Sequence, residues 1–356
     1  MKKKLVAVAV AGVLGAPLAA HAQTANVTLY GRLNVDFEVV NGRQPDGSNP
    51  TVSRLSSNSS RFGLRGTESL GGGLSAIFQI ESSINGDTSG GNLGGRETFV
   101  GFQGNWGKFT MGQFLMPLDD MHPIFGNVPT YTTSILSTAS VWAQGTSSKA
   151  DGGFDARLGN SLRYDSPSWS GLTFSTQVAL RDGSGTTGAN AIYNNGPWQA
   201  GIGYEGNEKV RGPDLNDYDI TITGGYNFGV VRIAGLYERI KYDTPTGDLK
   251  RDMWGASGTI PMGPGTWYVF YGWAGDGKGG AADGTRVAGL AKGDSTRAQH
   301  WELSYTYPFS KRTQVYAGYV KIDNDANASY TFNINPYPTA IGGKPQGFVM
   351  GMIHLF

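Results

Sequence analysis

Three arginines lie at similar distances from predicted tight turns, which is the spacing of a row of positive charges. Arg61, Arg96 and Arg157 lie six, eight and nine residues before turns that begin near positions 67, 104 and 166. If these turns share one rim, tilted strands place the guanidinium groups roughly 14–21 Å above it. Charges that face opposite charges across water create a transverse field that selects polar solutes. Asp119 and Asp120, in the longest gap between predicted strands, are the acidic candidates.

Residue parity predicts which side of a strand each arginine faces. Arg61 alternates with Phe62 and Leu64, so it lies on the opposite face from these apolar side chains. An arginine that faces lipid at mid-depth costs about 2–4 kcal/mol, so we expect the arginine face to point into a polar interior. The interior-facing arginines predicted in this way are Arg32, Arg61, Arg65, Arg157 and Arg163.

The facing of Arg96 remains open from sequence. If Arg96 faces the interior, parity carries Val100 and Phe102 inward and turns Glu97 outward. Contact with a neighbouring subunit is one arrangement that accommodates this outward acid. The acids Glu81 and Glu97, close to the same strands, leave the sign of the net field undetermined.

The elements that must position these charges alternate with a period of two, which is the period of β-strands. In the first run, residues Thr28, Tyr30, Arg32, Asn34 and Asp36 share one face, and Val27, Leu29, Leu33, Val35 and Phe37 share the other. A single run of this kind is more typical of a half-buried strand in a soluble sandwich, whereas sixteen runs, together with the export signal and the terminal Phe356, favour a barrel. The predicted strands are 26–38, 59–67, 74–84, 95–103, 107–114, 156–165, 171–181, 188–194, 197–205, 217–227, 230–242, 251–260, 265–274, 297–307, 311–322 and 346–356.

The gaps between these strands alternate between short and long, as the two rims of a transmembrane β-barrel do. Long gaps are predicted at 39–58, 85–94, 115–155, 206–216, 243–250, 275–296 and 323–345. An even strand count brings both termini to the short-turn rim, where the last strand, ending in Phe356, pairs with the first and closes the barrel. The segment 115–155 is long enough to be functional or disordered, and its apolar residues favour packing against the wall.

The amino terminus has the pattern of an export signal. A basic start, an apolar stretch and the sequence Ala20-His21-Ala22 predict a signal peptide over residues 1–22 and a mature domain over 23–356. The apolar stretch is too short for a transmembrane helix. We therefore expect export through the periplasm to the outer membrane.

Composition narrows the class of protein further. The 356 residues include 55 glycines and no cysteine, so a disulfide scaffold is excluded. Removing residues 1–22, which hold three lysines, changes the formal net charge from +1 to −2. This charge gives no electrostatic case for nucleic-acid binding. Low mean hydropathy with 17 tyrosines and 8 tryptophans is typical of a wall that is apolar outside and polar inside.

Four motifs resemble the general diffusion porins of Gram-negative bacteria, in the branch typical of β-proteobacteria. They are TLYG at 28–31, SRFGLRGTESLGGGL at 60–74, RLGNSLRYDSP at 157–167 and the closing HLF at 354–356. The resemblance covers the whole mature chain. It implies an all-β, 16-stranded antiparallel transmembrane barrel, a homotrimer, and a third extracellular loop folded into the lumen. It also implies a pore constriction in which Arg61, Arg96 and Arg157 oppose Asp119 and Asp120.

The resemblance has one departure. After the fifth strand the family often has Gly-Arg-Gln, whereas this chain has Met111-Gly112-Gln113-Phe114. The missing arginine weakens the expectation of a full basic cluster and of anion preference.

From the strand pattern and the resemblance together, we expect a passive, water-filled channel for ions and small hydrophilic solutes. We expect this channel to be surrounded by outer-membrane lipid and lipopolysaccharide.

Two other functions stay open from sequence, a substrate-specific channel and an outer-membrane barrel enzyme. His122, His300 and His354 are not accompanied by a nucleophile elbow or a zinc-protease motif, so we expect no catalytic residue. Asp323 to Asn327 misses the EF-hand pattern, so we also expect no metal site and no cofactor.

Overall fold

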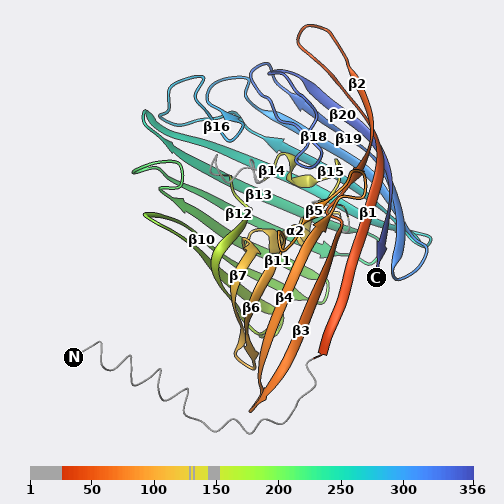
Figure 1. Cartoon of the computed structure of the whole chain (residues 1–356). Coiled ribbons are helices and arrows are strands. Elements are labelled where there is room, and N and C mark those ends of the chain that lie inside the picture. Colours follow the sequence, from red (N-terminus) through yellow and green to blue (C-terminus); the bar gives the residue numbers. More distant parts are fainter. Residues whose placement is uncertain (1–25, 128–129, 131–132, 143–152) are drawn as a thin grey trace.

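The computed structural model describes residues 26–127, 130, 133–142 and 153–356 and is nearly all β-sheet. The predicted signal peptide, 1–22, lies outside the described residues. The main sheet has 18 strand segments. Because β2 and β3 pair with successive parts of β1, and β5 and β6 with successive parts of β4, these segments make a wall of 16 strands. Figure 1 shows this wall as a ring of long, tilted strands.

The wall strands follow one another around the barrel in chain order, each antiparallel to the next. Their bounds are β1 Asn26–Arg43, β2 Thr51–Ser57, β3 Arg61–Gly71, β4 Leu74–Ile84, β5 Gly91–Asn92, β6 Thr98–Gly104, β7 Gly107–Leu115, β8 Arg157–Asp165, β9 Leu172–Arg181, β10 Ser184–Asn195, β11 Trp198–Glu208, β12 Asn216–Asn227, β13 Arg232–Thr244, β14 Gly247–Met262, β15 Gly265–Ala274, β18 Ala298–Pro308, β19 Thr313–Asn324 and β20 Lys344–Leu355.

The barrel closes between its first and last strands, as predicted. β1 pairs with β20 from Arg32 opposite Leu355 to Arg43 opposite Lys344. Phe356 continues this pairing, because its N–H donates to the Gly31 carbonyl at 3.1 Å and its carbonyl accepts from the Gly31 N–H at 2.9 Å. Closure leaves no unpaired sheet edge in lipid.

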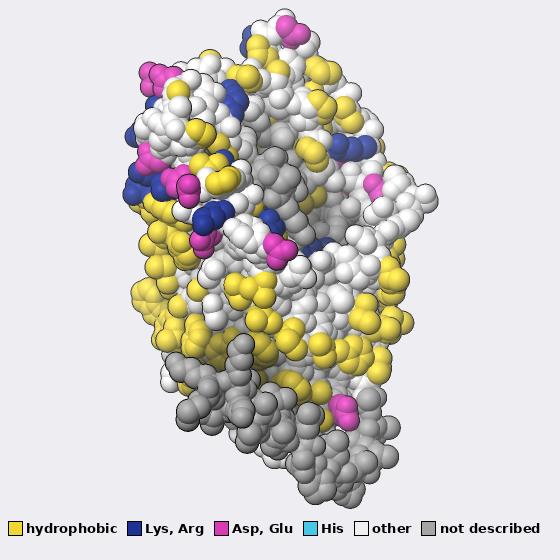
Figure 2. All heavy atoms as spheres, turned by 60° about the vertical axis from the view of Figure 1, so that its left-hand side comes forward, with side chains coloured by type: hydrophobic (Ala, Val, Ile, Leu, Met, Phe, Trp, Pro, Cys, Tyr) yellow, Lys and Arg dark blue, Asp and Glu magenta, His cyan; other side chains and the backbone are white. Residues whose placement is uncertain are grey.

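The two faces of the wall differ in chemistry, which follows from the period-two pattern. Along β1, Leu29, Leu33 and Phe37 are exposed on the outside, whereas Asn34 and Asp36 are buried on the inside. The same alternation continues around the barrel and gives it an apolar outer surface. Figure 2 shows these apolar side chains as a belt below a rim that carries most of the visible charges.

All connections at one rim are short, and the long loops all lie at the other rim, as predicted. Two predicted long gaps are shorter than expected. The gap 243–250 is a tight turn, because β13 runs to Thr244 and pairs there with Gly247 of β14. The gap 39–58 is largely strand, because β1 continues to Arg43 and β2 starts at Thr51. These strand ends are polar, so their sequence resembles a loop.

The third loop, residues 116–156, joins β7 to β8, and its described part contains three short helical turns. They are η1 Asp119–Met121, α2 His122–Phe125 and η2 Thr138–Ser140. The loop between β15 and β18 contains the small hairpin β16 Arg286–Val287 and β17 Leu290–Ala291. Within the described residues, no helix has the length and apolar character to span a membrane.

Candidate functional site

A glutamate of β4 lies between two of the predicted arginines. Glu81 Oε1 is 2.5 Å from Arg96 Nε, and Glu81 Oε2 is 3.4 Å from Arg61 Nε. Glu81 pairs across the sheet with Gly63, and the neighbouring pair, Leu64 with Ile80, is exposed on the outer face. Arg61, Glu81 and Arg96 therefore share the lumen side of the wall.

The positions of Arg96 and Glu97 differ from those predicted by residue parity. Val100 and Phe102 are exposed on the outer face although Arg96 contacts the lumen-facing Glu81. The strand is interrupted between β5 and β6, and Arg96 lies in this irregular stretch, where its N–H donates to the Glu81 carbonyl at 3.1 Å. An irregular stretch does not preserve parity, so the facing of β6 says nothing about Arg96.

The third arginine of the row lies beside the same irregular stretch. Arg157, the first residue of β8, has its Nη2 atom 3.9 Å from Glu97 Oε1. Glu97 therefore contacts an arginine on the lumen side. Parity had predicted that Glu97 would face outward if Arg96 faced inward, and this prediction is wrong. We call Arg61, Arg96 and Arg157 the arginine row.

Gln113 occupies the position where an arginine was expected from the resemblance. Its side-chain nitrogen donates to the carbonyls of Gly95 and Arg96, at 2.8 and 3.0 Å. The amide thus supports the irregular stretch that carries Arg96. A neutral hydrogen-bonding residue replaces a charge here and fixes the path of the neighbouring backbone.

The two predicted loop acids have different surroundings. Asp120 Oδ2 is 2.6 Å from Arg163 Nη2 and also accepts a hydrogen bond from Asn190 at 2.9 Å. Asp120 therefore binds the wall directly instead of facing an arginine across water. Asp119 is half-buried and lies beside His122 and Asp155.

The other predicted lumen arginines also contact their surroundings. Arg32 on β1 donates to Thr133 of the third loop at 3.0 Å. Arg65 on β3 lies over the ring of Tyr30, 5.0 Å from its centroid. Arg163 is shared by Asp120 and Asp165, the latter at 2.8 Å.

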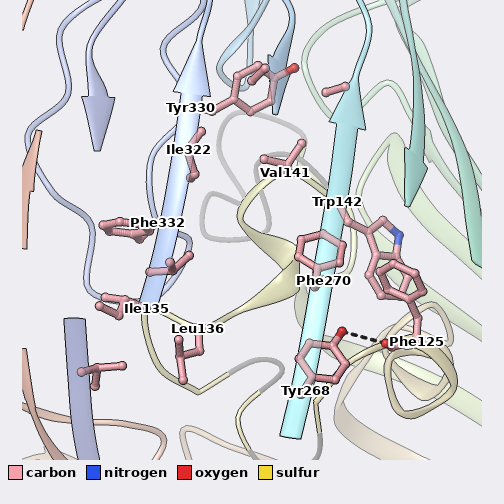
Figure 3. Close-up of a cluster of buried hydrophobic side chains, with 14 of the residues drawn as sticks. Phe125, Ile135, Leu136, Val141, Trp142, Tyr268, Phe270, Ile322, Tyr330 and Phe332 are labelled. Atoms are coloured by element: carbon pink, nitrogen blue, oxygen red, sulfur yellow. Dashed lines mark hydrogen bonds between the residues drawn. The ribbon is translucent and has the colours of Figure 1, made fainter. Parts of the chain in front are cut away.

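The first half of the third loop packs against inward-facing residues of the wall. The Phe125 carbonyl accepts hydrogen bonds from Ser257 of β14 and Tyr268 of β15, both at 2.8 Å. Asn127 then donates to Ser304 of β18 at 3.0 Å. Figure 3 shows Tyr268 pointing its hydroxyl group at Phe125. These contacts confirm the predicted packing of the loop against the wall.

The second half of the loop continues along the wall and then returns. Ser134 donates to Asp36 of β1 at 2.9 Å. Ile135 and Leu136 belong to a buried apolar cluster that also contains residues of β19 and β20 (Figure 3). On the return, Trp142 donates to Thr221 of β12 at 3.3 Å.

Inward-facing glycines accept the apolar side chains of the loop. A Cβ atom on Gly255 of β14 would lie 2.6 Å from the Phe125 ring, and one on Gly347 of β20 would lie 2.8 Å from Ile135. Side chains at these positions would displace the loop. This role of the glycines was not predicted from the sequence, although both glycines alternate with exposed aromatic residues, Trp254 and Phe348.

Comparison with known proteins agrees with this architecture. Residues 6–327 match a family model described as Gram-negative porin. The outer membrane porin protein 32 of Delftia acidovorans is 29% identical over 376 residues, which cover 100% of both chains. The structure of an anion-selective porin from Comamonas acidovorans matches with a TM-score of 0.72 and 25% identity, over 93% of this chain and 100% of that one.

A more distant likeness supports the fold alone. OmpT, an outer membrane protein of Vibrio cholerae solved in a trimer form, matches with a TM-score of 0.68 and 16% identity. It covers 94% of this chain and 100% of that chain. From the family match, the full-length relative and the barrel, we conclude that this chain belongs to the Gram-negative porin family and forms an outer-membrane channel for passive diffusion of ions and small hydrophilic solutes.

Proposed function

We propose that the narrowest part of this channel lies between the arginine row and the third loop. The support is the path of the loop. Its contacts run from Arg163 and Asn190, on β8 and β10, around the wall to Arg32 on β1. The remaining wall, from β3 to β8, carries Arg61 and Arg157 at its two ends. Water-filled space then remains in front of the arginine row.

The loop acid that faces this space is Asp119 in our proposal. Asp120 is held by Arg163, so its charge is compensated at 2.6 Å. Asp119 lies beside the loop end of β8, close enough for Arg157 to interact with its charge. A field between Arg157 and Asp119 orders water, so that polar solutes pass more easily than apolar ones.

We further infer that ion selectivity is weak. Three arginines of the row are accompanied by two glutamates, Glu81 and Glu97, at contact distances of 2.5 to 3.9 Å. The neutral Gln113 adds no charge. The solved relative from Comamonas acidovorans is named anion-selective. Here the compensated row supports a smaller preference than a row of unpaired arginines would give.

We also propose a homotrimer in outer-membrane lipid. The resemblance to general diffusion porins supports this assembly, and the apolar outer belt matches the hydrocarbon layer. In this arrangement lipopolysaccharide surrounds the rim that carries the long loops. The porin family consists of channels, so the enzyme alternative lacks support beyond a buried histidine, His122.

Planar-bilayer recording tests this proposal. The purified protein should insert in groups of three equal conductance steps, with a current that is linear in voltage and small shifts of reversal potential in a salt gradient. A current that saturates with one added solute would support the substrate-specific alternative. Absence of conductance from folded protein would contradict the channel, and single isolated steps would contradict the trimer.

A further inference from the structure

A histidine and two aspartates converge where the third loop begins and ends. Asp119 and His122 lie three residues apart on the turn made by η1 and α2, so their side chains share a face. Asp155, two residues before β8, reaches the same point. One metal-ligand atom from each residue lies within 4.8 Å of the other two, and His122 Nε2 is 2.6 Å from Asp155 Oδ2.

Two buried carboxylate oxygens near this triad have no hydrogen-bond partner within the part of the chain that the structure describes. They are Asp155 Oδ1 and Glu205 Oε1. The Glu205 side chain is fully buried on β11, and its other oxygen accepts a hydrogen bond from the Asp155 N–H at 2.9 Å. Burying a charged oxygen without a partner is costly unless a cation or a proton compensates it.

The charges around the triad are mostly negative. Asp155 and Asp120 both lie close enough to Asp119 to repel its negative charge. Asp219 on β12 adds to the repulsion at Asp155, and Arg157 is the cation that offsets it. A bound cation would relieve this repulsion.

We propose that Asp119, His122 and Asp155 form a binding site for a divalent transition-metal ion, with Glu205 as an adjoining carboxylate. One imidazole with carboxylates is a ligand set that suits Zn²⁺, whereas Ca²⁺ and Mg²⁺ prefer oxygen ligands alone. The Trp142 ring packs against the His122 imidazole, with 4.0 Å between the two ring centroids.

The present geometry requires a small contraction on binding. Metal–ligand bonds of about 2.0–2.2 Å bring the ligand atoms of a tetrahedral zinc site to roughly 3.4 Å from one another. Separations of up to 4.8 Å therefore shorten by up to about 1.4 Å, whereas the 2.6 Å between His122 Nε2 and Asp155 Oδ2 lengthens by about 0.8 Å. The hydrogen bond between His122 and Asp155 is replaced by one metal bond to each residue.

This site joins the two ends of the third loop to each other and to β11. A bound ion would therefore hold the loop in place and add two positive charges beside Arg157. Its effect on selectivity rests on the constriction proposed above, whereas the binding site itself does not.

Calorimetry of the folded, full-length protein in detergent tests the site. Titration with ZnCl₂ should show one ion bound per chain, and excess CaCl₂ should not displace it. Asp119→Asn should weaken binding by at least about tenfold. Asp119 is a suitable target because it is the half-buried member of the triad, whereas His122 and Asp155 are buried, so the barrel should fold normally.

His122→Gln provides a second ligand variant, and His354→Gln is the matched control. His354 is exposed near the end of β20 and should leave zinc binding unchanged. Absence of saturable binding in the wild type would overturn the site. Zinc binding by both ligand variants that is as tight as in the wild type would also overturn it. Equal displacement by Ca²⁺ would overturn the transition-metal assignment.

Recording in a salt gradient separates the site from its effect. Zn²⁺ should shift the reversal potential of the wild type toward anion permeability and should not do so in Asp119→Asn. Zinc binding without any shift would contradict the effect on selectivity and leave the site standing.

Discussion

Asp120 of the third loop and Arg163 of β8 form an ion pair, with 2.6 Å between Asp120 Oδ2 and Arg163 Nη2. An acid that was expected to face the arginines across water is thus a tether between loop and wall. The tether lies at the start of the loop, next to the Pro117 carbonyl that accepts a hydrogen bond from Asn190. The position of the loop therefore depends on specific wall residues.

Loss of this tether should loosen the loop. Asp120→Asn removes a partly exposed ion pair, which is worth about 1 kcal/mol or less, so the barrel should stay folded. We expect greater noise in the open-channel current at nearly unchanged mean conductance. Asp325→Asn, which removes the exposed pair with Arg297, is the control. Identical noise in the two variants would show that Asp120 does not restrain the loop.

Removal of the glutamate beside the arginine row should increase the permeability to anions. Glu81→Gln takes one negative charge from between Arg61 and Arg96 while keeping the size of the side chain. The reversal potential in a salt gradient should shift toward anion permeability. Glu208→Gln, at the exposed end of β11, should leave it unchanged. A shift toward cations in Glu81→Gln would contradict the proposed role of the row.

The glycine contacts predict that valine substitutions at two glycines of β14 differ in their effect on stability. Gly255→Val places side-chain atoms against Phe125, and overpacking of this kind costs about 1–3 kcal/mol. We expect a lower free energy of unfolding in urea and an altered conductance as the loop moves. Gly258→Val is the matched control on β14, because a Cβ there has no atom within 4 Å among the described residues. Equal effects of the two substitutions would disprove the contact.

Phe356 should contribute to stability through its ring. Phe356→Ala keeps the backbone bonds to Gly31 but removes a ring that is 43% exposed. Burial of about half of an aromatic side chain is worth roughly 1 kcal/mol. We expect a loss of this size in the free energy of unfolding, measured by urea titration in lipid vesicles. Phe309→Ala, in an exposed turn at 68% exposure, should cost less.

The wall of this barrel was predictable because its signal is local. Period-two alternation places Leu29 outside and Asn34 inside without knowledge of any distant residue. The same rule identified the lumen side of Arg61, and lipid makes errors of facing costly. It also located the closing pair of strands, since an even strand count brings Phe356 beside the first strand.

The site was less predictable because it depends on irregular backbone. Arg96 lies between β5 and β6, where parity is lost, so its contact with Glu81 could not be read from alternation. The partner of Asp120 depends on the path of a loop that has no period. Gly255 did offer a signal, since an inward glycine beside an exposed tryptophan leaves room for another segment to approach.

The reversal potential of Arg157→Glu tests the central claim, that the arginine row borders the passage of ions. Arg157→Glu changes the charge beside the passage by two units, and each unit charge interacts with an ion 4 Å away in water by on the order of 1 kcal/mol. The permeability ratio should therefore move several-fold toward cations. Arg312→Glu, in an exposed turn at the opposite rim from the loops, is the control and should change it little. An unchanged reversal potential in Arg157→Glu, with normal conductance steps, would contradict the account.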